Sequence, residues 1–135
     1  MILELDLSSE IPIYVQLRNQ IVMGIARGQL RTGESLPTVR RMAADAGINT
    51  MTVNKAYQLL KAEGYIEIDR RHGAAVRENL DMDREFREKF TSELELLSAQ
   101  AAAKGLPKEE FLILCSRIFD EFSGCSKKYA QPREG

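Results

Sequence analysis

The sequence predicts a mainly α-helical chain with one small β hairpin. Three observations support this class. Apolar residues recur at helical spacing in five stretches, Gly or Pro marks the ends of most of them, and one short stretch alternates apolar and polar residues as a strand does. We expect three helices and the hairpin in residues 1–78, two more helices in residues 79–122, and a flexible tail in residues 123–135.

Length, charge and cysteine content narrow the class of protein. The 135 residues suffice for a small domain with an appendage, but not for the large sheet of a typical cofactor enzyme. The net charge is −1, yet residues 38–77 hold seven Lys and Arg against four Asp and Glu, which favours phosphate binding there. We find no signal peptide and no apolar run of about 20 residues, and therefore expect a cytoplasmic protein without a membrane partner.

The titratable residues indicate neither a metal nor a cofactor. The single histidine, His72, and the two cysteines, Cys115 and Cys125, do not have the spacing of a metal-ligand cluster. We expect two free thiols, with redox sensing as the alternative.

The N-terminal part of the sequence predicts an arm, a helix and a turn. Residues 1–10 alternate apolar and acidic side chains and should form an extended arm, in which Ser8 and Ser9 offer a helix cap. The helix that follows should end at Gly28, and residues 29–37 have the composition of a turn. One face of this helix carries apolar residues at every fourth position: Ile13, Leu17, Ile21 and Ile25.

Two short helices joined by a tight turn come next. Thr38 should cap a helix over residues 39–45, which Gly47 ends. Asn49 should cap a second helix that runs to about Glu63. This pattern predicts a helix-turn-helix. The residues expected in its core are Met42, Val53, Ala56, Tyr57 and Leu60.

A β hairpin is predicted directly after the second of these helices. Residues 65–68 alternate at period two, residues 70–73 supply the turn, and residues 74–76 return as a second strand. A hairpin in this place is the wing of a winged helix-turn-helix, which we therefore expect to occupy residues 1–78.

Residues 79–122 predict a two-helix dimerisation element. A long helix over residues 82–104 ends at Gly105, and a second begins at Pro107 and reaches about Phe122. All five phenylalanines lie in this part, and two helices cannot cover so much apolar surface by packing only on each other. A second copy of the chain is the natural cover, giving a homodimer. The residues expected at the interface, with the cysteine buried among them, are Phe86, Phe90, Leu94, Leu97, Phe111, Cys115, Ile118, Phe119 and Phe122.

Three blocks of sequence resemble the GntR family of winged-helix regulators, in its short YtrA-like subfamily. They are PIYVQL at residues 12–17, followed by IARG at 25–28; GESLPTVR at 33–40; and NTMTVNKAY at 49–57, followed by Glu63-Gly64. Larger members carry an effector-binding or aminotransferase-like domain after the wing. About 55 residues are too few for either, so no enzymatic activity is implied and no effector is evident.

The resemblance implies that the helix capped by Asn49 lies in the major groove of double-stranded DNA. The carboxamides of Asn54 and Gln58 can pair with adenine, and Thr50 or Met51 can contact a thymine methyl group. Arg40 should reach a guanine or a phosphate, and the wing tip should contact a minor groove or the DNA backbone. The full set of expected DNA-binding residues is Thr38, Arg40, Arg41, Asn49, Thr50, Met51, Thr52, Asn54, Lys55, Gln58, Arg71, His72 and Gly73.

Some of these residues have other interpretations or depart from the family pattern. Many GntR members carry Arg at the position of Thr50, and often another at Asn54, so this chain should favour A·T over guanine readout. Thr38 and Asn49 are expected mainly as helix caps, with a DNA contact as a second role. His72 lies at a hairpin tip, where contact with DNA and simple exposure to solvent are equally expected.

The sequence predicts a DNA-binding transcriptional regulator. We expect it to be a repressor that binds a pseudo-palindromic operator as a homodimer. Two alternatives remain open. In the first, the winged helix binds another protein and does not bind DNA sequence-specifically. The basic residues Arg40, Arg41 and Lys55 favour DNA over this alternative. The second is an enzyme, for which the sequence offers no nucleophile with a base, no carboxylate pair and no phosphate loop.

Overall fold

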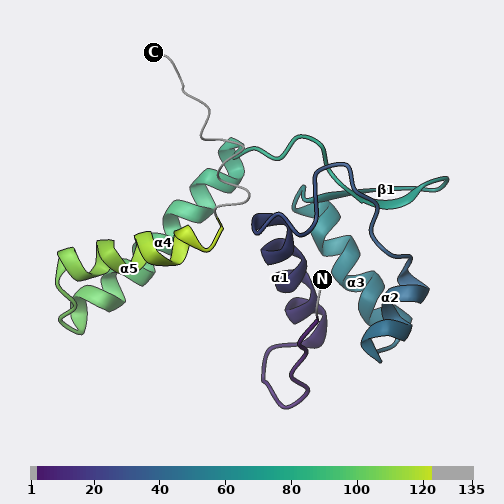
Figure 1. Ribbon diagram of the computed structural model, residues 1–135. Helices are drawn as coiled ribbons and strands as arrows, with labels where there is room; N and C mark the ends of the chain where they lie inside the picture. The colour runs from purple at the N-terminus through teal and green to yellow at the C-terminus, as the bar shows by residue number, and fades with distance from the viewer. Residues whose placement is uncertain (1–2, 123–135) are drawn as a thin grey trace. The chain divides into compact units, whose positions relative to one another are not determined.

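The computed structural model describes residues 3–122, which form two compact units, residues 3–80 and residues 81–122 (Figure 1). The predicted class, mainly helical with one hairpin, is confirmed. The predicted tail over residues 123–135, with Cys125, lies outside the described residues. The elements in chain order are α1 (Ile13–Ala26), α2 (Val39–Ala46), α3 (Thr50–Ala62), β1 (Ile66–Asp69), β2 (Gly73–Val76), α4 (Arg84–Ala103) and α5 (Lys108–Asp120).

The core of the first unit forms around α3, which packs against α1, α2 and β1. Figure 1 shows α3 between the other two helices. Of the apolar residues at every fourth position of α1, Leu17, Ile21 and Ile25 are buried as predicted, and Ile13 in the first turn is half-buried. Burying one such aliphatic side chain contributes about 1.5–3 kcal/mol. The residues predicted in the core are confirmed there, and the largest side chains that are fully buried are Tyr57, Leu17, Ile21, Leu60, Ile66, Val53 and Val76.

The N-terminal arm is held along α1 by two glutamines. Gln20 accepts a hydrogen bond from the backbone N–H of Glu4 at 2.8 Å and donates one to its carbonyl, and Gln16 does the same for Asp6 at 2.8 and 2.9 Å. Glu4 and Asp6 are two residues apart, which in an extended chain is about 6.8 Å, and Gln16 and Gln20 are four residues apart on α1, which is roughly 6.0 Å along the helix axis. The two spacings are similar, so each glutamine can reach one residue of the arm. The two carboxamides therefore bond the extended arm as a neighbouring strand would.

The prediction that Ser8 and Ser9 cap the first helix is wrong. The residue that precedes α1 is Pro12, and no side chain caps this helix. Instead Ser8 donates a hydrogen bond to the carboxylate of Asp6 at 2.7 Å, and the Ser9 hydroxyl accepts one from the Ile11 backbone at 3.1 Å. Because short polar side chains bond readily to their neighbours, both serines stabilise the turn before the helix rather than the helix end.

The hairpin is antiparallel and has a third segment at its edge. Ile66 pairs with Val76 at its base, and Asp69 pairs with Gly73 at its tip. Residues 33–36, predicted only as part of a turn, pair with the free edge of β2. Val76 donates to the Glu34 carbonyl and Leu36 donates to the Ala74 carbonyl, both at 2.8 Å. The backbone groups on this edge of β2 thereby gain partners, which anchors the wing to the segment that leads into α2.

The second unit consists of α4 and α5. Asp83 caps α4 by accepting a hydrogen bond from the Phe86 backbone at 2.8 Å, and Pro107 precedes α5. Neither helix has a buried residue, which leaves most of their large apolar side chains exposed. Within residues 3–122, none of the helices combines the length and the apolar character that a membrane crossing needs.

Candidate nucleic-acid interface

Each helix of the helix-turn-helix begins at a side-chain cap. The Thr38 hydroxyl accepts a hydrogen bond from the Arg41 backbone at 3.1 Å, and the Asn49 carbonyl oxygen accepts one from the Thr52 backbone at 2.8 Å. Gly47 ends α2 with a φ of 71°, which a residue with a Cβ adopts at a cost. The predicted caps are confirmed, and both helices end within one residue of the predicted positions.

Tyr57 links the two helices through a polar contact that the sequence analysis did not anticipate. Its ring is fully buried, and its hydroxyl donates a hydrogen bond to the Pro37 carbonyl at 2.8 Å, just before α2 begins. Burial raises the pKa of the Tyr57 hydroxyl above its ordinary value, so it remains a donor. The presence of Tyr rather than Phe at this core position could have indicated the hydrogen bond, since buried Tyr hydroxyls require a partner.

The face of α3 opposite its buried stripe is uncharged and accessible. Met51 is 80% exposed, and Thr50, Asn54 and Gln58 are also exposed. Because residues three and four positions apart lie on one side of a helix, Met51, Asn54 and Gln58 share this face. Thr52, predicted with them, is only half-buried on the flank of the helix. The face thus offers carboxamides and one methionine.

Lys55 lies at the edge of this face, over an aromatic ring of α1. Its Nζ is 4.2 Å from the centroid of the Tyr14 ring, within the range of a cation–π interaction. Lys55 is exposed and Tyr14 is half-buried. The sequence analysis did not single out Tyr14, because no local pattern shows which residues of α1 and α3 meet.

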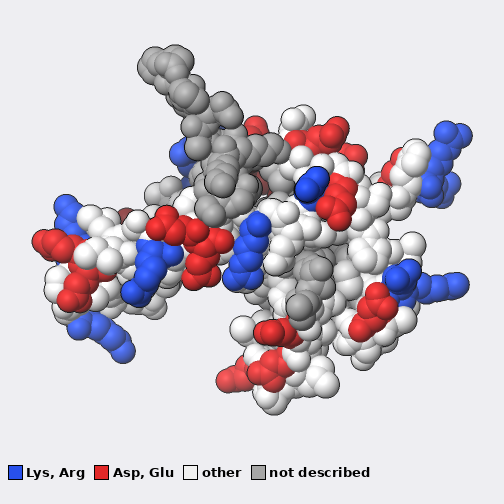
Figure 2. Space-filling model, in the orientation of Figure 1, with Lys and Arg blue, Asp and Glu red and all other residues white. Residues whose placement is uncertain are grey.

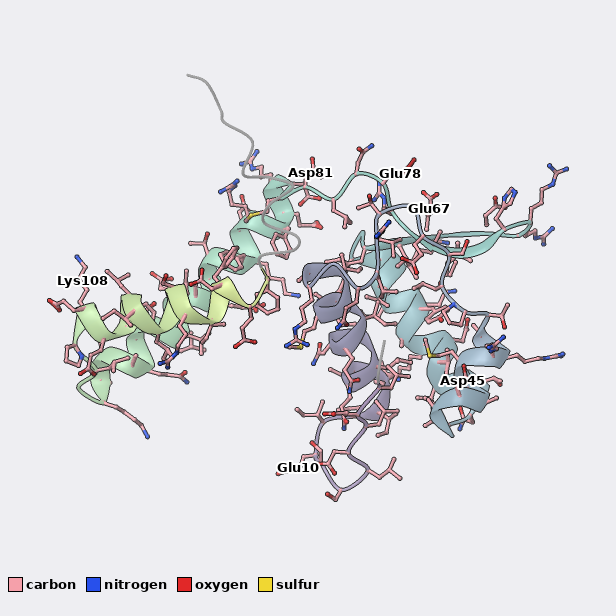
Figure 3. All side chains as sticks on the ribbon, in the orientation of Figure 1. Glu10, Asp45, Glu67, Glu78, Asp81 and Lys108 are labelled. Atoms are coloured by element: carbon pink, nitrogen blue, oxygen red, sulfur yellow. The ribbon has the colours of Figure 1, made fainter. Side chains whose placement is uncertain are left out.

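The two arginines of α2 are exposed, and only Arg41 forms an ion pair within the described residues. Arg41 Nε is 3.5 Å from the carboxylate of Asp45, one turn later on α2, where Figure 3 labels it. The two side chains are 76% and 59% exposed, and an ion pair so exposed contributes no more than about 1 kcal/mol. Arg41 is thus free to exchange this carboxylate for a phosphate. Within the described residues, Arg40 makes no ion pair.

The tip of the hairpin is organised by Asp69. One carboxylate oxygen accepts a hydrogen bond from the Arg71 backbone at 2.9 Å, and the other lies 2.7 Å from His72 Nδ1. The bond with His72, and then the one from Arg71, hold the pKa of Asp69 below its ordinary value. Gly73 closes the turn with a φ of 76°. The sequence analysis named His72, Arg71 and Gly73 but missed Asp69, whose acidic character is untypical of a DNA contact.

These features lie together on the first unit. Figure 2 shows Lys and Arg side chains that project from α2 and from the end of the hairpin on the same side of the unit. Every predicted DNA-binding residue belongs to α2, α3, their caps or the hairpin tip, and all but Thr52 are exposed. Within residues 3–122, no three His, Cys, Asp or Glu side chains gather in a group that could hold a metal ion.

Comparison with known proteins identifies the family of this unit. The family described as "Bacterial regulatory proteins, gntR family" matches residues 13–76, from the start of α1 to the end of β2. YhcF of Bacillus subtilis, an uncharacterized HTH-type transcriptional regulator, is 35% identical over 102 residues, which are 75% of this chain and 84% of YhcF. The chain belongs to the GntR family. It is a DNA-binding transcriptional regulator with a winged helix-turn-helix.

Two relatives of this chain bear the name YtrA. The HTH-type transcriptional repressor YtrA of Bacillus subtilis is 38% identical over 77 residues, which are 57% of this chain and 59% of that protein. The structure of YtrA from Sulfolobus acidocaldarius, a GntR-family transcription factor, has a TM-score of 0.64 and 34% identity, with 76% of this chain covering 99% of that one. Both agree with the resemblance to the YtrA-like subfamily seen in the sequence.

Proposed function

We propose that this GntR-family chain is a homodimeric repressor that binds a pseudo-palindromic operator through α3 and the wing. The observation that carries the proposal is the exposed, uncharged face of α3 flanked by cations on α2 and at the hairpin tip. A helix inserted into the major groove needs hydrogen-bonding groups at its centre and positive charge at its edges, where the phosphates lie.

The centre of the α3 face supports readout of base edges. Asn54 and Gln58 are one turn apart and exposed, and a carboxamide can bond adenine N6 and N7 together. Met51 and Thr50 supply apolar atoms for thymine methyl groups. With no arginine on this face, the chain selects A·T pairs opposite α3, and Arg40 at the start of α2 supplies the one contact to guanine.

The edges of the face support phosphate binding. Arg41 and Lys55 flank the helix-turn-helix, and Arg71 and His72 extend the contact to the wing, where Gly73 allows a close approach of the backbone. Thr38 and Asn49 contribute mainly as caps that orient the helices. Each phosphate neutralised releases counterions, so the affinity should fall steeply with salt.

The second unit supports dimerisation. Leu97 is 60% exposed on α4 and Phe119 is 64% exposed on α5, while Phe111 and Phe122 are half-buried. Apolar side chains in such numbers on two helices mark an interface. Cys115, which is exposed in the single chain, would be covered in the pair. We assign residues 1–78 to DNA binding and residues 79–122 to dimerisation, close to the boundary between Leu80 and Asp81 that divides the two units.

A dimer of this kind presents two α3 helices to half-sites about 34 Å apart, one turn of the DNA helix. Repression would follow from occupation of a promoter, which excludes the polymerase. The name of the Bacillus subtilis relative YtrA, a transcriptional repressor, supports this sign of regulation.

Selection of bound duplexes from a random pool tests the DNA-binding part of the proposal. The wild-type chain should recover a pseudo-palindrome with A·T pairs opposite α3. Arg40→Ala and Asn54→Ala should each relax the preference at one position per half-site, whereas Lys89→Ala, which removes an exposed cation of α4, should recover the wild-type sequence. If Arg40→Ala left both affinity and preference unchanged, or if Asn54 selected guanine, the assignment of this surface would be wrong.

Sedimentation equilibrium tests the dimer. The wild-type chain should have twice the mass of the monomer, and Leu97→Glu and Phe119→Glu should each return it to the monomer. Leu7→Glu is the matched control, because Leu7 is 80% exposed but lies on the N-terminal arm. A monomeric wild-type chain, or an equal effect of all three substitutions, would contradict the assignment of α4 and α5.

A further inference from the structure

The contact between Lys55 and Tyr14 differs from the ion pairs of the described residues. Arg18, Arg41 and Arg84 each pair with a carboxylate, at 2.8, 3.5 and 3.2 Å respectively. Lys55 instead has its Nζ 4.2 Å from the centroid of an uncharged ring. A carboxylate would fix the ammonium and also cancel its charge, and it would have to be displaced before a phosphate could bind. The Tyr14 ring fixes the ammonium without cancelling its charge.

The position of the pair suits contact with the DNA backbone. Lys55 is exposed and lies on α3 between the uncharged face, which includes Met51, and the flank where Thr52 and Leu59 are half-buried. Lys55 is four residues after Met51 and four before Leu59, and residues so spaced are neighbours on a helix, so Lys55 lies at the border between the face and the flank. In a groove-bound helix the flanks face the phosphates on either side of the groove.

Tyr14 itself is held in place. It lies in the first turn of α1, is half-buried, and packs against the apolar core of the unit. An otherwise mobile lysine has several rotatable bonds, and ordering them opposes binding. A ring anchored in the core restricts these bonds before DNA arrives.

We propose that Tyr14 is a positioning residue that holds the Lys55 ammonium ready to bind a DNA phosphate. The inference rests on the proposed function and adds to it a residue of α1 that does not itself contact a base. The ammonium keeps its full charge and its N–H donors, and the chain avoids part of the entropy lost on binding.

A double-mutant cycle tests the pair, with fluorescence anisotropy as the readout and the duplex recovered by the wild-type chain as the probe. Lys55→Gln should weaken binding and reduce the slope of log Kobs against log salt by about 0.9, the value for one phosphate. Tyr14→Leu should weaken binding about 2- to 5-fold, with the slope unchanged because the lysine remains. In the Lys55→Gln background, Tyr14→Leu should have no further effect.

Tyr14→Phe is the matched control, since it keeps the ring and removes only the hydroxyl. It should bind DNA as the wild-type chain does. Equal losses for Tyr14→Phe and Tyr14→Leu would show that the hydroxyl contacts DNA directly and would overturn the positioning role. The positioning role would also be overturned if Tyr14→Leu weakened binding equally in the wild-type chain and in the Lys55→Gln background. Should Tyr14→Leu fail to show cooperative thermal unfolding, Tyr14→Met removes the ring with a more adaptable side chain.

NMR of the free protein separates the failure of this inference from the failure of the proposed function. The Lys55 ε-methylene protons should be shifted upfield by the ring current in the wild-type chain and in Tyr14→Phe, but not in Tyr14→Leu. Absence of that shift would overturn the pair whatever the DNA result. If the wild-type chain bound no duplex, the proposed function would fail, and this inference with it, even where the ring-current shift was present.

Discussion

Tyr57→Phe removes one oxygen atom from the core of the first unit. The Tyr57 side chain is 1% exposed, so the phenylalanine ring can occupy the same space. The atom lost is the donor of the 2.8 Å hydrogen bond to the Pro37 carbonyl, which joins the middle of α3 to the segment before α2. The substitution therefore isolates this bond from the packing of the ring.

The expected loss of stability follows from the environments of the two partners. A hydrogen bond of this kind contributes about 0.5–1.5 kcal/mol net, and more when its removal leaves a buried group without a partner. Pro37 lies at an exposed position, so water can replace the hydroxyl at its carbonyl. We expect a decrease of about 1 kcal/mol in the free energy of unfolding. For a unit of this size, that corresponds to a fall of roughly 4–8 °C in Tm.

Thermal and urea unfolding, monitored by circular dichroism, measure this change. Tyr14→Phe is the control, because within the described residues the Tyr14 hydroxyl makes no hydrogen bond and its loss should alter stability by less than about 0.5 kcal/mol. A Tyr57→Phe variant as stable as the wild-type chain would refute the claim that this bond fastens α2 to α3. A loss above about 3 kcal/mol would instead show that the ring does not repack in the same place.

Three further predictions concern the turn and the wing tip. Asn49→Ala removes the cap that accepts the Thr52 backbone N–H, and should destabilise the unit by about 1 kcal/mol in urea unfolding; no change would mean that water replaces this cap. Gly47→Ala meets no atom within 4 Å of the added Cβ, so only the backbone at φ 71° opposes it; a loss of about 1 kcal/mol is expected, and a stabilised variant would be contrary to it. The pKa of Asp69 is lowered in the folded chain, so its contribution is present above its ordinary value of 3.8 and is lost as the pH falls through the folded pKa. The Arg71 amide resonance should report this titration at acid pH, and in Asp69→Asn the titration should be absent; a shift that persisted in this variant would assign it to another group.

The sequence predicted the first unit well because its determinants are local. The caps Thr38 and Asn49 bond to backbone groups three residues away, and Gly47 and Gly73 adopt the turns that their positions in the sequence indicate. Helical periodicity then identified most of the buried residues of α1 and α3, whereas Leu30 and Leu36 are buried in the stretch predicted only as a turn. Such signals lie within a few positions of one another, so they can be read without knowledge of the fold.

The contacts that the sequence did not reveal join distant segments. Tyr57 reaches Pro37, Lys55 reaches Tyr14, and Ser35 pairs with Ala75 at the edge of the hairpin. Each depends on which faces of two elements meet, and neither periodicity nor composition specifies this. A buried Tyr indicates that a partner exists but not which one, and a turn-like composition did not distinguish a loop from a segment added to a sheet edge.

The most direct test of sequence-specific DNA binding by this chain is the salt dependence of its affinity for two duplexes, the one recovered by selection and one of scrambled sequence. Both should bind, with log Kobs falling steeply as log salt rises, because both offer phosphates to Arg41, Lys55 and the wing tip. The selected duplex should bind at least about 1,000-fold more tightly at physiological salt, because only it matches the α3 face and Arg40. Equal affinities for the two duplexes, or binding that does not depend on salt, would contradict the account.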